Sequence, residues 1–204
     1  SLIITIPTVI GTLFLSSLAG YSLAMHRFKL NLLVFAMFIA GNFVPYQILM
    51  IPVRNISIEL GMYNSHLGLI IFHIAFQTGF CTFFLRNFIK ELPFELIEAA
   101  RADGATEWTI YRKIIIPLTI PALAALGVLE FTFIWNDYFW ALILTQGDTV
   151  KPITVGLDVL RGQWTTAWNL VSAGSVVAAL PPVIMFFILQ RQFIQGLTFG
   201  AVKG

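Results

Sequence analysis

Five long apolar segments constrain the fold of this chain more than any other feature. They cover residues 1–25, 32–53, 67–85, 118–144 and 168–190. A helix that crosses a bilayer needs about 20 mostly apolar residues, and each segment is close to or above that length. Backbone polar groups in hydrocarbon must be satisfied within their own segment, so helices are the expected form. We therefore predict an all-α fold, a polytopic integral membrane helical bundle of five transmembrane helices, with residues 1–204 as a single transmembrane domain.

The composition also favours a bilayer as the solvent. The chain is 58% hydrophobic and 11% charged, whereas a soluble domain carries about 25% charged residues. A net charge of +2 gives no reason to expect nucleic acid as a partner. The chain starts at Ser1, without a methionine and already inside an apolar segment. We expect a fragment that lacks its true N-terminus.

The basic residues predict the orientation in the membrane. Most Lys and Arg residues lie in the connectors after the first and third apolar segments and in the tail. Basic residues near the ends of spans favour the cytoplasm. We therefore expect residues 86–117 and the C-terminus to be cytoplasmic, with Ser1 outside. Aromatic residues at the opposite span ends are typical of an interfacial belt; they are Tyr138, Trp140, Trp164 and Trp168.

The connector at residues 86–117 contains a concentrated charged stretch and signals for two short helices. Pro93 fits the first turn of a helix, where its missing N–H costs nothing. Gly104 suits the left-handed position that follows a helix. Thr106 can cap a second helix, in which Trp108, Tyr111 and Ile115 would share a face. The pattern predicts a helix–turn–helix at the cytoplasmic surface.

Two interpretations of this helix–turn–helix follow from the residues alone. It can be an amphipathic segment that only anchors the loop at the membrane surface. It can instead be a docking element, because the small side chains of Ala99 and Ala100 would allow another protein to approach closely. The charge of Glu98 beside them would then fix the register of docking.

A spaced motif in this connector resembles the EAA loop of ABC importer permeases. The family pattern is E-A-A, three residues, G, nine residues, I-x-L-P, and the chain matches it except for Ile116 in the leucine position. Residues on either side of the glycine match the common variant D-G-A. The coupling residues that the resemblance implies are Glu98, Ala99, Ala100, Asp103, Gly104, Ala105, Ile114 and Pro117.

The resemblance implies a set of partners and a location. The loop would insert into a groove on a separate ATPase subunit, where Glu98 would pair with a basic residue. A second, related permease chain and an external solute-binding protein would complete the transporter in the bacterial plasma (inner) membrane. ATP and Mg would bind to the ATPase partner, and this chain would carry no cofactor.

Three further segments resemble the maltose-type sugar permeases. They are "SLAGYSLAMHRFK" (Ser17–Lys29), "FIWNDYFWALILT" (Phe133–Thr145) and "RQFIQGLTFGAVKG" (Arg191–Gly204). The resemblance implies that the transported solute is a sugar. An importer for a non-sugar solute, such as a phosphorylated polyol, is the alternative within this class, and a passive channel is the rival from another class.

Polar residues within the apolar segments are candidates for the solute pathway. A charge deep in a bilayer is costly and usually faces a cavity, a partner or another charge. Glu130 and Asp137 lie seven residues apart, near one face of the fourth segment. Asn136 and Asp137 can instead simply ease the helix toward water. The candidates are Asn42, Gln47, Glu130, Asn136 and Asp137, of which the first two can bond a sugar hydroxyl or another helix.

No catalytic or metal-binding motif is present in the sequence. It contains no G-x-x-x-x-G-K-[ST], H-E-x-x-H, C-x-x-C or G-x-S-x-G, so a phosphate cradle, a zinc site and a hydrolase elbow of these types are not predicted. His66 and His73 are expected to be packing or hydrogen-bonding residues. We expect neither catalytic nor metal-ligating residues, and so no enzymatic activity in this chain.

Overall fold

The computed structural model describes residues 1–162 and 166–198, and the described residues form helices and no strand. Trp164 and the last six residues of the tail motif lie outside them. The elements are α1 (Leu2–Met25), α2 (Asn31–Ala40), η1 (Gly41–Phe43), η2 (Tyr46–Leu49), α3 (Met50–Glu59), α4 (His66–Lys90), α5 (Phe94–Ala102), α6 (Glu107–Ile110), the π-helical η3 (Tyr111–Ile115), α7 (Ile116–Trp135), α8 (Phe139–Leu144), α9 (Ile153–Val159) and α10 (Trp168–Thr198).

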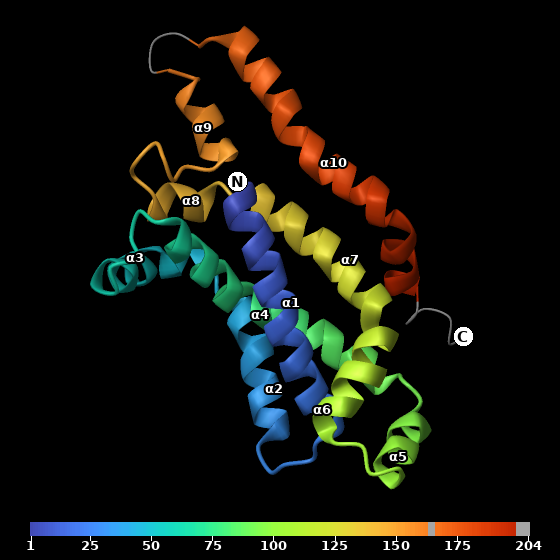
Figure 1. Cartoon of the computed structure of the whole chain (residues 1–204). Helices are drawn as coiled ribbons and strands as arrows, with labels where there is room; N and C mark the ends of the chain where they lie inside the picture. The colour runs from blue at the N-terminus through green and yellow to red at the C-terminus, as the bar shows by residue number, and fades with distance from the viewer. Residues whose placement is uncertain (163–165, 199–204) are drawn as a thin grey trace.

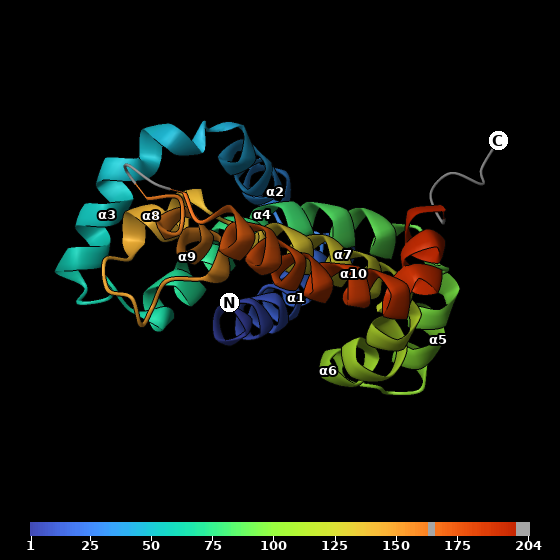
Figure 2. The ribbon, with the colours of Figure 1, turned by 90° about the horizontal axis from the view of Figure 1, so that it is seen from above.

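The long helices α1, α4 and α7 pack together at the centre of the molecule, and α10 lies along α7 (Figures 1 and 2). The short helices α5 and α6 lie at one end, whereas the N-terminus, α3, α8 and α9 lie at the other (Figure 1). Among the described residues, four helices are long and apolar enough to cross a membrane, or five elements if the bent α2–α3 segment counts as one span. This confirms the predicted helical membrane fold.

The second apolar segment is not the continuous helix that the sequence predicts. The helical stretches at residues 31–43 and 46–59 meet at an angle of 90°. Pro45 lies at the break, has no backbone N–H to donate and disfavours a helical residue before it. Val44 accordingly has an extended conformation, with φ −74° and ψ 120°. The predicted straight span is therefore a bent pair of helices, with the proline at the bend.

The fourth apolar segment is also interrupted, because α7 ends at Trp135 rather than continuing to residue 144. The Asp137 carboxylate accepts hydrogen bonds from the backbone N–H groups of Trp140 (3.3 Å) and Ala141 (2.9 Å), which starts α8 in a new direction. Trp140, predicted for the interfacial belt, is only 4% exposed. Its ring lies 4.2 Å from that of Phe72, centroid to centroid. Trp140 is therefore a core residue.

Helices α1 and α4 approach each other closely because the face of α1 toward the core carries small side chains. A Cβ on Gly20 would lie 3.1 Å from both the Leu85 Cβ and the Arg86 backbone nitrogen. Small interfacial residues of this kind let membrane helices pack backbone to backbone. The buried residues on this face of α1 are Thr5, Thr8, Thr12, Ser16 and Gly20.

Candidate functional site

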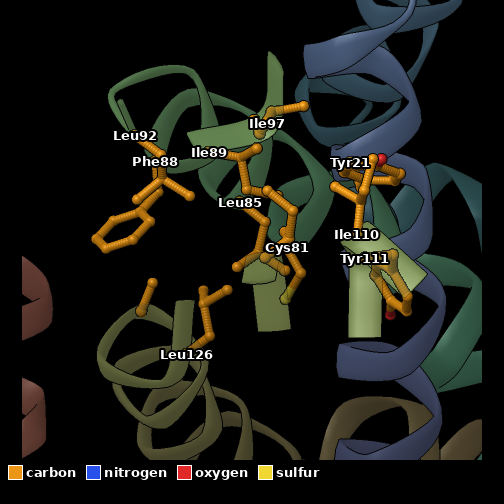
Figure 3. Packing of buried hydrophobic residues seen from close by; sticks show 12 residues of the cluster. Tyr21, Cys81, Leu85, Phe88, Ile89, Leu92, Ile97, Ile110, Tyr111 and Leu126 are labelled. Atoms are coloured by element: carbon orange, nitrogen blue, oxygen red, sulfur yellow. The ribbon is translucent and has the colours of Figure 1, made fainter. Parts of the chain in front are cut away.

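The helix–turn–helix formed by α5 and α6 is held against the bundle by an apolar anchor. Ile97 of α5 and Ile110 of α6 are 1% and 0% exposed. They belong to one buried cluster with Leu85 and Ile89 of α4 and with Tyr111 (Figure 3). We call residues 94–117, the part of the predicted coupling segment 86–117 from the start of α5 to the motif proline, the coupling loop; its role in coupling stays a prediction. Its inner side is part of the hydrophobic core.

The turn of the coupling loop has the glycine geometry that the sequence predicts. Gly104 has a φ of +79°, in the left-handed region that favours glycine. The backbone N–H of Ala105 donates to the Ala100 carbonyl (2.9 Å), and that of Gly104 donates to the Arg101 carbonyl (3.0 Å). These two bonds form a Schellman motif, which ends α5 sharply.

The second helix of the loop begins at the predicted cap. The Thr106 hydroxyl accepts a hydrogen bond from the backbone N–H of Thr109 at 3.3 Å, as an N-cap does. The predicted common face divides, because Tyr111 and Ile115 are buried whereas Trp108 is 56% exposed. The ring of Trp108 nevertheless stacks on that of Tyr111, with their centroids 5.3 Å apart.

The outer side of the coupling loop presents the central motif residues to the surroundings. Glu98 and Ala99 are exposed one and two residues after the buried Ile97. Glu98 forms no ion pair with another described residue. Of the remaining motif residues, Asp103, Gly104 and Pro117 are exposed, and Ala100, Ala105 and Ile114 are partly buried. The arrangement leaves an acidic surface with small side chains on a helix that is anchored on its inner side.

Four polar side chains, Tyr21, His26, Arg101 and Glu107, connect the coupling loop to the end of α1, and we call them the Glu107 cluster. The Tyr21 hydroxyl donates to Glu107 Oε2 at 2.6 Å. Arg101 donates from Nε to Oε1 at 2.9 Å and from Nη2 to Oε2 at 3.3 Å. His26 Nε2 lies 3.4 Å from Oε2. One carboxylate thus joins α5, α6 and α1.

The electrostatics of the Glu107 cluster favour its charged form. The hydrogen bonds that Arg101 donates to Glu107 raise the pKa of the guanidinium above its ordinary value, so Arg101 stays charged. A second contact lies beside the cluster, where the hydroxyls of Ser17 and Tyr111 are 2.7 Å apart and buried. The rings of Tyr21 and Tyr111 lie 5.5 Å apart, centroid to centroid. The loop is therefore fastened to α1 at two neighbouring points.

Sequence reasoning missed the Glu107 cluster. Arg101 and Glu107 have opposite charges on either side of the glycine turn, and that spacing was a usable signal for their pairing. Nothing in the sequence connects them with Tyr21, because 86 residues separate Tyr21 from Glu107. These residues meet only because α7, which follows α6 and η3 in the chain, packs against α1.

The structure does not bring the five candidate pathway residues together in a single site. The side-chain amides of Asn42 and Asn136 each donate to a carbonyl of the preceding turn, at 2.8 Å. Gln47 is exposed in η2, at the bend. Glu130 is buried and accepts a hydrogen bond from Cys81 Sγ at 3.2 Å. The Asp137 carboxylate accepts the two backbone hydrogen bonds from the start of α8 described above. Their role in a solute pathway therefore stays a prediction.

His73 has a carboxylate neighbour that its own apolar segment does not supply. Its Nε2 lies 3.5 Å from Asp137 Oδ2, and both side chains are nearly buried. These two residues line a cavity of about 10 Å³ together with Ser1 and Thr5. The pair brings α4 within 3.5 Å of the segment that follows α7, and the buried His73 is a packing residue at this contact.

Comparisons with known proteins agree with this architecture. A probable ABC transporter permease protein of Pyrococcus horikoshii is 40% identical over 91% of this chain and 68% of the relative. The arabinooligosaccharides transport system permease protein AraQ of Halalkalibacterium halodurans is 36% identical over 98% and 71%. A crystal structure of a bacterial ABC transporter involved in alginate import has the same fold, with a TM-score of 0.76 and 24% identity over 94% of this chain and 74% of the other.

The family of the chain follows from a match over nearly its whole length. Residues 12–199 match the family described as binding-protein-dependent transport system inner membrane component. The matched region contains the coupling loop and all the helices from Thr12 of α1 to α10. This chain therefore belongs to the family of inner membrane components of binding-protein-dependent transport systems.

Proposed function

We propose that this chain is the permease subunit of an ATP-driven importer for a sugar, and that its coupling loop docks on a separate ATPase subunit. The chain would form half of the translocation pathway, next to a second, related permease chain. An external solute-binding protein would deliver the sugar. The coupling loop and the C-terminus would lie on the cytoplasmic side of the bacterial inner membrane.

One observation carries the ATPase part of this proposal. The coupling loop presents Glu98 and Ala99 outward and buries Ile97 and Ile110 inward. A surface that another protein pulls on must be accessible on one side and rigidly attached on the other. The buried side chains of Ile97 and Ile110 and the Glu107 cluster supply that attachment. A force applied to α5 would therefore reach α1 and α7 rather than only deform the loop.

The relatives support a carbohydrate as the solute. AraQ is named for arabinooligosaccharides, and this chain aligns with nearly all of its own length to that relative. The phosphorylated polyol is the alternative solute class. Uptake of radiolabelled arabinooligosaccharides, maltose and glycerol phosphate by membrane vesicles that contain the assembled transporter distinguishes the two classes. Uptake without ATP would instead indicate the passive channel.

The variant Glu98→Lys tests the coupling role. We expect normal membrane insertion, loss of solute-stimulated ATP hydrolysis and loss of uptake, because a reversed charge on the docking surface repels a basic partner. Glu95→Lys is the matched control, since Glu95 is also an exposed glutamate of α5 but lies outside the motif. Wild-type ATP hydrolysis and uptake in the Glu98 variant would refute the proposal.

A further inference from the structure

Two neighbouring hollows lie at the end of the bundle that carries the coupling loop, and they border the site described above at His26 and Phe94. One, of about 360 Å³, is lined mainly by the turn between α1 and α2 and by Lys90. The other, of about 510 Å³, lies between the end of α1 and the start of the coupling loop. Arg27 and Lys90 line both hollows, and Lys29 lines the first. We call this region the basic groove.

The basic residues of the basic groove lack an ion-pair partner in the described part of the chain. Arg27, Lys29 and Lys90 form no ion pair there. Arg101, at the same end of the molecule, is in contrast paired with Glu107 at 2.9 Å. Like charges held near each other repel, and a bound anion would relieve that repulsion. The groove thus has the electrostatic character of an anion site.

Exposed apolar side chains border the same groove. Phe28 and Leu32 line the first hollow and are 44% and 74% exposed. Phe94 lines the second and is 46% exposed. An occupant that matches both features has an anionic head and an apolar body.

The length of α1 predicts that the groove lies at the depth of lipid headgroups. Helix α1 has 24 residues, which is a length of about 36 Å, against a hydrocarbon core about 30 Å thick. The turn that follows α1 therefore emerges just beyond the hydrocarbon. Basic pockets between membrane helices at this depth bind acidic headgroups.

We propose that the basic groove binds the headgroup of an anionic phospholipid. The phosphate would lie between Arg27 and Lys90, the two basic residues that line both hollows, and the acyl chains would follow the apolar border at Leu32. Arginine suits this role because its planar guanidinium can donate two hydrogen bonds to one phosphate. The inference requires only that the chain spans a membrane, so it does not depend on the solute or on the ATPase.

Lipid titration followed by native mass spectrometry tests the proposal. The intact permease, with the subunits that co-purify, is delipidated in detergent and titrated with dioleoyl phosphatidylglycerol or with dioleoyl phosphatidylcholine. We expect Arg27→Gln/Lys90→Gln to bind phosphatidylglycerol about 25-fold more weakly, at roughly fivefold per basic residue. Binding of phosphatidylcholine should stay unchanged. Arg112→Gln/Lys113→Gln is the matched control, because it removes two exposed charges in the coupling loop, outside the groove, and it should change phosphatidylglycerol binding less than twofold.

Three outcomes would overturn the proposal. The first is equal weakening in the test and control variants, which would show that only overall charge matters. The second is complete displacement of phosphatidylglycerol by millimolar inorganic phosphate, which would make free phosphate the ligand. The third is phosphatidylglycerol binding by the permease alone but not by the complete assembly, which would show that a protein subunit covers the groove.

Discussion

Removal of the hydrogen bond between Tyr21 and Glu107 should loosen the coupling loop without unfolding the bundle. The Tyr21 hydroxyl donates to the carboxylate at 2.6 Å, and a hydrogen bond to a charged group contributes about 1.5–3 kcal/mol. The Glu107 side chain is 47% exposed, so solvent screening reduces this contribution to about 1–2 kcal/mol. Tyr21→Phe deletes the donor and keeps the ring, which isolates this one bond.

Amide hydrogen exchange in residues 94–111 measures the effect. A loss of about 1.4 kcal/mol corresponds to a tenfold change in an opening equilibrium. We therefore expect amides of α5 and α6 to exchange about tenfold faster in Tyr21→Phe, while amides in the middle of α4 exchange at the wild-type rate. Glu107→Gln should have a larger effect, because it also weakens the pair with Arg101.

The double variant and a distant control make this prediction refutable. If Tyr21 and Glu107 act through one bond, the effects of the two substitutions must be less than additive, by about 1 kcal/mol. Tyr138→Phe removes a similar bond, 2.8 Å to Asp158, at the opposite end of the molecule, and should leave the loop unaffected. The reasoning is refuted if Tyr21→Phe changes exchange less than twofold, or if the two effects simply add.

Two further substitutions and one labelling experiment test separate parts of the structure. Gly104→Ala should destabilise the coupling loop by about 1–2 kcal/mol, because the left-handed conformation penalises a Cβ, and exchange of the same amides measures this. Gly20→Val should lower the thermal unfolding temperature in detergent, since overpacking costs about 1–3 kcal/mol and the new atoms would meet Leu85; an unchanged temperature would contradict the close packing of α1 and α4. Cys81 is 0% exposed, so maleimide labelling followed by intact mass should proceed only on unfolding, and rapid labelling of the folded protein would contradict its burial.

The sequence predicted what depends on local chemistry. Apolar length alone was sufficient for the helical membrane fold. The turn at Gly104 and the cap at Thr106 were also predictable, because a left-handed glycine and a capping hydroxyl are local features. These two signals predicted where the first short helix of the coupling loop ends and where the second begins.

The features that sequence reasoning missed depend on which helix lies beside which. The contacts of Glu107 with Tyr21 and of Asp137 with His73 join segments that are remote in the chain. The bend at Pro45 is a different kind of error, because prolines occur in other helices of this protein without a comparable break. A hydropathy pattern gives the length of an apolar segment, but it does not show whether the helix formed by that segment is straight.

The π-helical turn at residues 111–115 has a practical consequence for building chimeric transporters. A π-turn is equivalent to one extra residue in a helix, which advances the chain by about 100° around the helix axis. The inserted residue therefore sets the direction in which Glu107 points around the helix axis, relative to the residues of α7. A foreign loop spliced in at Arg112 would lose that phase and point its acidic residue away from Tyr21. Splicing at Pro117 would transfer α5, α6 and the π-turn together. It would therefore preserve the orientation of the acidic residue toward Tyr21, on which force transfer would depend.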